Sequence, residues 1–219
     1  MRKSRFYIIA ILTTILCVAP HLSVAQRYAL EFKAGVVTTS TSNSLCSRKS
    51  FADVRMGSSV GGGFSYIFAD GLLRAVGEVY YTSQGEKYKF DDESSDFEST
   101  LCYFKTSPSL RFYTPYIPMY VGVGMYYGVA VTRDVAKGDT LDQSHSWTKR
   151  EYYKPLDLGA RLAVGTELGV GSIRLLLEAA YEHGMLNISN REARRISNRC
   201  VYLTVGLNFR IAGRFFRPY

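Results

Sequence analysis

A pair of strictly alternating segments, joined by a short turn, constrains the fold of this chain more than any other feature. Residues 154–168 and 172–184 place apolar side chains at every second position. Side chains alternate across a β-strand, so these segments predict a hairpin with one apolar and one polar face. Each segment is long enough to cross a bilayer when tilted, which takes about 9–11 residues. The apolar face carries Leu156, Leu158, Ala160, Leu162, Val164, Leu168, Ile173, Leu175, Leu177, Ala179 and Tyr181; the polar face carries Asp157, Arg161, Glu167, Arg174, Glu178 and Glu182.

The same alternation recurs along most of the chain. It predicts eight strands, at residues 27–39, 57–68, 72–83, 101–113, 119–131, 154–168, 172–184 and 201–211. Short connections (69–71, 114–118 and 169–171) alternate with long ones (40–56, 84–100, 132–154 and 182–200). Outer-membrane barrels show this asymmetry, because successive connections lie at opposite ends of the barrel. The sequence therefore predicts an all-β fold, an eight-stranded antiparallel up-and-down transmembrane β-barrel.

The N-terminus has the features of a secretory signal peptide. Arg2, Lys3 and Arg5 precede an apolar run at residues 6–18, and small residues at 23–25 offer a cleavage site. The alternative is a transmembrane anchor, which needs about 20 residues and so exceeds this run. We expect a signal peptide at residues 1–25 and an outer-membrane β-barrel domain at residues 26–219. No later apolar run suits a spanning helix, and only a closed barrel satisfies the backbone in lipid without one.

The distribution of charge indicates which face meets lipid. The chain carries a net charge of +8, which falls to +5 when the three basic residues of the signal peptide are removed, and so small an excess does not suggest nucleic acid. The polar face carries both signs, as in Arg74 with Glu78, and an Arg exposed to lipid at mid-depth costs about 2–4 kcal/mol. We expect these charges to pair inside the barrel, filling a lumen that eight strands leave just wide enough for side chains. Aromatic residues near the strand ends suit the headgroup boundary: Tyr28, Phe68, Tyr81, Tyr127, Tyr181 and Phe209.

Two features complicate this pattern. Pro108 lies inside the fourth predicted strand, where its missing N–H predicts a bulge or a local opening. Three cysteines remain after signal cleavage, Cys46, Cys102 and Cys200, so one disulfide and one free thiol are allowed. Because the first and last long loops meet when a barrel closes, Cys46–Cys200 is the preferred bridge.

The sequence identifies no catalytic residue, no cofactor-binding residue and no metal ligand, and we expect no cofactor. His145 and His183 leave open a lipid-modifying enzyme, although no catalytic motif accompanies them. An acidic cluster in the second long loop could bind a divalent cation, but such runs are usually solvated; it comprises Asp91, Asp92, Glu93, Asp96 and Glu98. An arginine cluster in the fourth long loop matches glycolipid phosphates or simply solubilises the loop; it comprises Arg191, Arg194, Arg195 and Arg199.

Several short phrases resemble the PorT-like outer-membrane β-barrel family over nearly the whole of residues 26–219. They are FKAG at 32–35, GEVYYTSQG at 77–85, FKTSPSLRFY at 104–113, YVGVGMY at 120–126, DLGARLAVG at 157–165 and YEHGMLNI at 181–188. The resemblance implies an eight-stranded outer-membrane barrel and places Pro108 where the family has its Pro. Some members of that family assist a protein-secretion system, and the resemblance implies no catalytic role for any residue.

The last predicted strand resembles the sorting signal read by the barrel-assembly machinery, in the pattern Thr204-x-Gly206-x-x-Phe209-x-Ile211. The pattern ends before the C-terminus and has Ile where an aromatic is usual. We therefore favour an outer-membrane barrel with a filled lumen and a structural or interaction role, an accessory role in secretion included, among lipid and glycolipid. The alternatives are a lipid-modifying enzyme and a soluble lipocalin-like periplasmic barrel, which would turn its apolar face inward.

Overall fold

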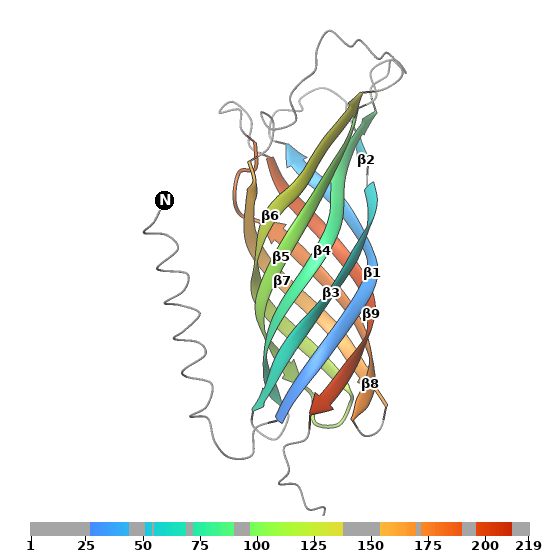
Figure 1. Cartoon of the computed structure of the whole chain (residues 1–219), viewed down its shortest axis with the longest axis vertical. Helices are drawn as coiled ribbons and strands as arrows, with labels where there is room; N and C mark the ends of the chain where they lie inside the picture. Colours follow the sequence, from blue (N-terminus) through green and yellow to red (C-terminus); the bar gives the residue numbers. More distant parts are fainter. Residues whose placement is uncertain are drawn as a thin grey trace, which may run out of the picture.

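The computed structural model describes residues 27–43, 51–53, 55–68, 72–89, 97–137, 154–169, 172–189 and 196–211. The regular elements within these residues are strands (Figure 1). No helix in the described ranges is long and apolar enough to cross a membrane. The strands are β1 (Arg27–Asn43), β2 (Phe51–Asp53), β3 (Arg55–Phe68), β4 (Leu73–Lys89), β5 (Phe97–Tyr113), β6 (Met119–Lys137), β7 (Leu156–Leu168), β8 (Ile173–Gly184) and β9 (Ile196–Ile211).

These strands close into one barrel. Each long strand pairs antiparallel with its neighbours in the chain, and β9 returns to β1 with Tyr28 opposite Ile211 and Asn43 opposite Ile196. The short β2 continues the line of β3, because both pair with β4. With β2 and β3 counted as one strand of the wall, the barrel has eight strands, which confirms the predicted eight-stranded up-and-down barrel.

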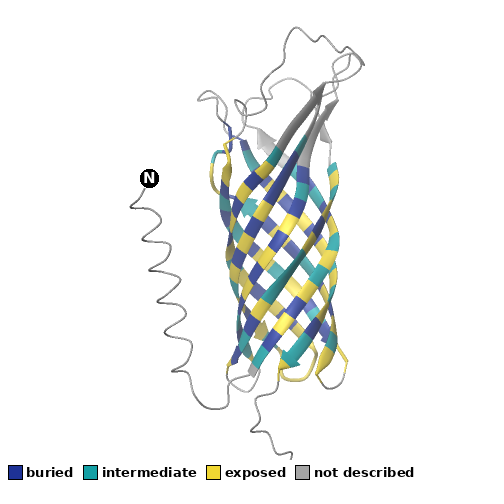
Figure 2. Ribbon diagram, in the orientation of Figure 1, coloured by how far each residue is buried: buried dark blue, intermediate teal, exposed yellow. Residues whose placement is uncertain are grey.

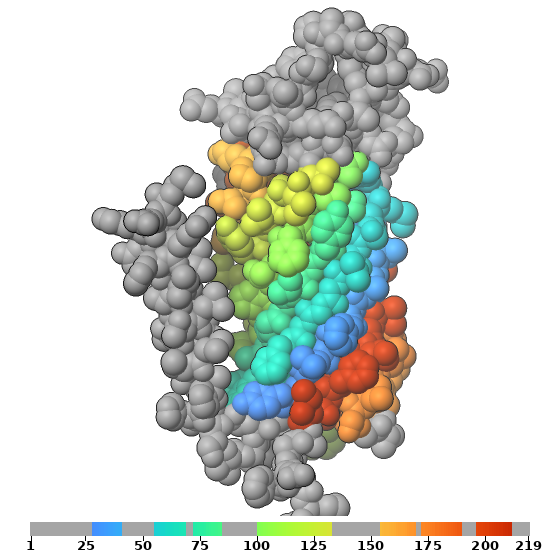
Figure 3. Space-filling model, viewed as in Figure 1, coloured from blue at the N-terminus to red at the C-terminus, as the bar shows by residue number. Residues whose placement is uncertain are grey.

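Side-chain exposure alternates between buried and exposed along the long strands (Figure 2). In β7 and β8 the inward Arg161, Glu167, Glu178 and Glu182 are buried, whereas the intervening Leu and Val side chains lie on the outer wall, as predicted. The predicted boundary aromatics such as Tyr81 and Phe68 also lie outside. On the face seen in Figure 3, the side chains of β1, β3, β4, β5 and β6 pack into a continuous surface. This orientation is the opposite of a lipocalin-like barrel, whose apolar face would point inward.

The predicted strand ends are wrong on the side of the long connections. β4 continues to Lys89, β5 begins at Phe97 and β6 continues to Lys137, so much of the predicted 84–100 loop is strand. β2 falls within the predicted 40–56 loop, and β9 begins five residues earlier than predicted, at Ile196. These extensions carry polar sequences that lack an apolar alternation, and pairing with the neighbouring strand holds them (Figure 1).

Pro108 opens the ladder without creating a bulge. The β5–β6 pairing lapses between Thr106, opposite Tyr127, and Ser109, opposite Gly124, and resumes in the same register. The Ser107 hydroxyl donates to the Met125 carbonyl oxygen at 2.9 Å and partly fills the gap. The register shift in this pair lies instead between Cys102 and Tyr103. The predicted local opening is thus confirmed, whereas the alternative of a bulge at Pro108 is wrong.

Candidate functional site

The lumen gathers the charged side chains of the described strands. The buried ones occupy inward positions of the alternation and point to the barrel axis from five strands, β1, β4, β5, β7 and β8. Buried charges are stable only when paired and hydrogen-bonded. The pairs connect different strands, some neighbouring and some on opposite sides of the lumen, rather than residues of one strand such as Arg74 and Glu78. The buried ionic residues are Glu31, Arg74, Glu78, Lys105, Arg111, Asp157, Arg161, Glu167, Glu178 and Glu182.

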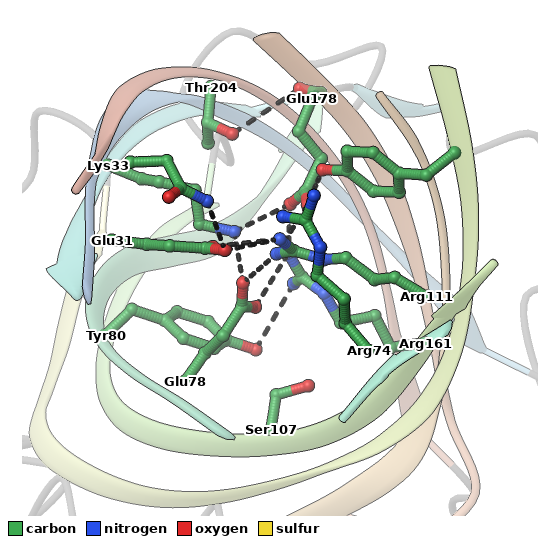
Figure 4. A network of polar contacts seen from close by, with 12 residues as sticks. Glu31, Lys33, Arg74, Glu78, Tyr80, Ser107, Arg111, Arg161, Glu178 and Thr204 are labelled. Carbon is green, nitrogen blue, oxygen red and sulfur yellow. Dashed lines mark hydrogen bonds and ion pairs between the residues drawn. The ribbon is translucent and has the colours of Figure 1, made fainter. Parts of the chain in front are cut away.

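Arg111 is at the centre of this network (Figure 4). Its Nη1 lies 2.9 Å from both carboxylate oxygens of Glu31, and its Nη2 lies 2.6 Å from Glu78 and 3.1 Å from Glu178. Lys33 pairs with Glu78 and, at 2.9 Å, with Glu178. The two cations therefore bridge three carboxylates from β1, β4 and β8, in charge-assisted hydrogen bonds of the stronger kind.

Glu182 forms the next layer towards the long connections. Arg161 Nη1 lies 2.7 Å from its Oε1, and Lys105 Nζ lies 2.8 Å from its Oε2. The Tyr202 hydroxyl donates to Oε2 at 2.8 Å, and the Tyr80 hydroxyl also donates to this carboxylate. Arg161 also pairs with Glu178 at 2.9 Å, which joins this layer to the central one. Every polar atom of the Glu182 carboxylate therefore has a partner.

Glu167 forms the layer at the short-turn end. Arg74 Nη1 and the Tyr113 hydroxyl each lie 2.5 Å from its Oε1, and Arg210 Nη2 lies 3.1 Å from Oε2. The Arg74 guanidinium also stacks 3.8 Å from the centroid of the Tyr113 ring. Asn208 donates to both Glu167 and Glu31, so this layer too is linked to the centre.

An apolar layer closes the lumen at the other end. The segment that follows β8 turns inward, and the backbone N–H of Met185 donates to the Leu158 carbonyl at 2.8 Å. Ile188 is fully buried there and exchanges backbone bonds with Lys154 and Ile196. It packs in a cluster with Leu101, Tyr103, Ala130 and Ile196. This apolar cluster covers the ionic layers at the end of the long connections and excludes water from that side of the network.

Very little space remains between these layers. A cavity of about 20 Å³ lies beside Lys33, Gly61, Glu78 and Arg161, which is room for about one water molecule. Within the described ranges, no three His, Cys, Asp or Glu side chains lie close enough to hold a metal ion. The lumen is thus a filled polar core. Its arrangement supports rigidity.

The loop residues singled out in the sequence mostly fall outside the described residues. These are Cys46, Asp91, Asp92, Glu93, Asp96, His145, Arg191, Arg194 and Arg195, together with residues 1–26. Glu98 lies in β5. His183 lies on the outer wall, where its Nδ1 is 3.3 Å from the Tyr181 hydroxyl. Arg199 lies next to it, since the two residues are opposite each other in the β8–β9 register.

The cysteines differ from the expectation. Cys102 and Cys200 are both free and buried, so the preferred Cys46–Cys200 bridge is wrong. The reason is the direction of the side chain: Cys200 faces into the lumen, packed with Val37, Tyr80 and Tyr202, rather than towards the loops. The inward position follows from the alternation of β9, which the early start of that strand extends back to Cys200.

The closed wall, the apolar exterior and the paired ionic interior together define a transmembrane β-barrel protein. The model of the outer membrane protein beta-barrel domain family matches residues 23–190. The chain therefore belongs to this family, and the outer membrane is the location that this membership indicates. None of the curated proteins matches the sequence.

Solved barrels resemble the chain at low identity. Neisserial surface protein A shares 18% identity, over 83% of this chain and 97% of its own, with a TM-score of 0.45. The attachment invasion locus protein Ail of Yersinia pestis shares 12%, over 85% and 100%, with a TM-score of 0.44. The outer membrane protein AlkL shares 13%, over 91% and 98%, with a TM-score of 0.48. At such identities the likeness carries no information about function.

Proposed function

We propose that this protein is an exported, integral outer-membrane barrel with a structural or interaction role, and that it is neither a pore nor an enzyme. The filled lumen carries the proposal, because a barrel whose axis is occupied by three linked ionic layers leaves only its wall and its two ends for function. A signal peptide at residues 1–25 and insertion by the barrel-assembly machinery through the β9 pattern complete the proposed route to the membrane.

The end of the barrel that carries the long connections supports an interaction role. We call it the raised end, because part of the wall projects there. β4, β5 and β6 continue to pair with one another beyond the last residue of β6 that pairs with β7, which is Val129 (Figure 1). The resulting sheet projects on the side of the long connections, where an envelope partner can reach it. The PorT-like resemblance suggests the finer role, an accessory to protein secretion, with a secretion protein as the partner.

The enzyme alternative gains no support from the site. Among the described residues, the Tyr181 hydroxyl is the side-chain partner of His183, and no carboxylate lies beside that ring to orient it. A nucleophile and an orienting acid are what a histidine-dependent hydrolase requires. The enzyme reading therefore stays the weaker candidate, and His183→Ala in a lipid-hydrolysis assay would test it.

Site-specific photo-crosslinking in intact cells tests the interaction role. A photo-reactive amino acid at Met185, exposed at the raised end, should capture an envelope protein, and on the finer proposal that protein belongs to a secretion system. The same amino acid at Tyr116, which is 95% exposed in the opposite short turn, is the matched control. Absence of any adduct from Met185 and from other exposed positions at the same end of the barrel would contradict the proposal.

A further inference from the structure

Three side chains with polar groups, Tyr181, His183 and Arg199, interrupt the apolar outer wall at the raised end. Along β8 the outward positions run from Ile173 to Tyr181 and then reach His183, and along β9 they run back from Ile211 to Val201 and then reach Arg199. His183 and Arg199 are opposite each other, which places their Cβ atoms about 4.5–5.5 Å apart. The Tyr181 hydroxyl lies 3.3 Å from His183 Nδ1. Hydrogen-bonding groups from two strands thus converge on one spot of the wall.

Arg199 is available to a ligand. Its side chain is exposed, and it forms no ion pair with a carboxylate in the part of the chain that the structure describes. The buried Arg74, Arg111 and Arg161, in contrast, are paired with carboxylates inside the lumen. An exposed guanidinium presents a planar fork of N–H donors that matches the geometry of phosphate oxygens.

The depth of Arg199 matches a lipid headgroup. The outward apolar run of β9 from Val201 to Ile211 rises about 25 Å, at about 3.3 Å per residue and a tilt of about 40°. This height equals that of the apolar band of an outer-membrane barrel. Arg199 follows directly after the run, so it lies at the boundary between acyl chains and headgroups.

A groove lies on the same wall, further along β8 and β9 within the apolar band. It has a volume of about 560 Å³ and an almost entirely apolar lining, in which Ala34 and Ala179 are small residues among larger ones. Ala179 is opposite Leu203, two outward positions along the strands from His183 and Arg199. The lining side chains include Ala34, Val36, Leu177, Ala179, Leu203 and Val205.

We propose that this wall binds one phosphorylated lipid from the leaflet on the raised side, with its phosphate on Arg199 and His183 and an acyl chain in the groove. The groove favours a lipid over a soluble anion, because an apolar groove in the acyl-chain band, two outward positions from the polar spot, suits the chain of a lipid whose phosphate lies at that spot. The inference rests on the membrane placement in the proposed function and gives that placement a specific lipid partner.

Native mass spectrometry of the full-length mature protein in lipid nanodiscs tests the headgroup contact. Nanodiscs carry either a bisphosphorylated glycolipid (lipid A) or the same lipid after removal of its phosphates. We expect the wild type to retain the phosphorylated lipid, and Arg199→Gln to lower its affinity about tenfold. Lys154→Gln, which removes an exposed positive charge elsewhere at the raised end, should retain the lipid normally. Equal retention by Arg199→Gln, or of the dephosphorylated lipid, would overturn the proposal.

A second pair of variants tests the groove. Ala179→Phe fills it and should lower lipid retention several-fold, whereas Ala75→Phe, on the outer face of β4 away from the groove, should not. Heat-modifiable electrophoretic mobility shows for each variant whether the barrel is folded in the membrane. A folded, inserted barrel with unaltered lipid binding in Ala179→Phe contradicts the lipid site alone, and failure to insert the wild type contradicts the proposed function.

Discussion

The Arg111 guanidinium lies 2.9 Å from both carboxylate oxygens of Glu31, although β5 and β1 are not neighbouring strands. The contact therefore crosses the lumen and ties opposite walls together. Both side chains are almost fully buried, so the pair is desolvated and depends on further partners to remain stable. Glu78 and Glu178 supply those partners on the other edge of the guanidinium.

Removing Arg111 should destabilise the barrel strongly. Arg111→Met leaves three buried carboxylates short of a positive partner, and breaking such a network lowers the free energy of unfolding by about 3–5 kcal/mol. Urea unfolding of the liposome-inserted protein, followed by far-ultraviolet circular dichroism, measures this. Lys154→Met, at an exposed position, should change it by less than about 0.5 kcal/mol. A loss below about 1 kcal/mol in Arg111→Met would show that the network does not hold the walls together.

Placing a charge on the outer wall should destabilise the barrel in proportion to its depth. Val205 lies outside, near the middle of the apolar run of β9, so Val205→Arg should cost about 2–4 kcal/mol of folding free energy in a bilayer. Tyr116→Arg, in the exposed short turn, should cost little. The same unfolding titration compares the two variants. Comparable costs at both positions would mean that Val205 does not face lipid.

Gly165 makes room for an inward aromatic ring. A Cβ at this position would lie 2.5 Å from the Cζ and hydroxyl oxygen of Tyr120, and that hydroxyl donates to Glu178 at 2.6 Å. Gly165→Ala should therefore disturb the central layer and lower the free energy of unfolding by about 1–3 kcal/mol. At Gly122 a Cβ would meet Ala163 at an ordinary 3.4 Å, so Gly122→Ala is the control and should be nearly neutral. Equal tolerance of both would refute the tight packing of Tyr120.

The two described cysteines should behave as protected thiols. Cys102 and Cys200 are free and buried, so a membrane-permeant maleimide should leave both unlabelled in the folded barrel and label both after denaturation. Mass spectrometry of peptides digested without reduction locates the label. Rapid labelling of Cys200 in the folded protein would mean that its thiol does not face the packed lumen.

The faces of the barrel could be predicted from the sequence because they depend on a local rule. Side chains alternate with a period of two, so Leu158 and Arg161 are assigned to opposite faces without knowledge of any other strand. The same rule assigned the charged residues to the lumen. It also allowed Pro108 to be recognised as a break in the ladder, since a missing N–H is a property of the residue itself.

The partners within the lumen could not be predicted in this way. Glu31 meets Arg111, and Glu167 meets Arg74, only because the barrel closes with a particular stagger, which no single strand encodes. The raised ends of β4 and β6 were missed because sequences such as Glu86–Lys89 lack an apolar alternation, and pairing with β5, together with β2 in the case of β4, makes them strands. The free thiol of Cys200 followed from the early start of β9, for the same reason.

Single-channel recording in planar bilayers measures whether paired charges fill the lumen of this barrel. The wild-type protein should give no stable conductance across an applied potential, because the linked layers around Glu167, Arg111 and Glu182 occupy the axis. The protein must be shown by its heat-modifiable mobility to be folded and inserted in the same preparation. Large, stable conductance steps from that preparation would show that the lumen is open.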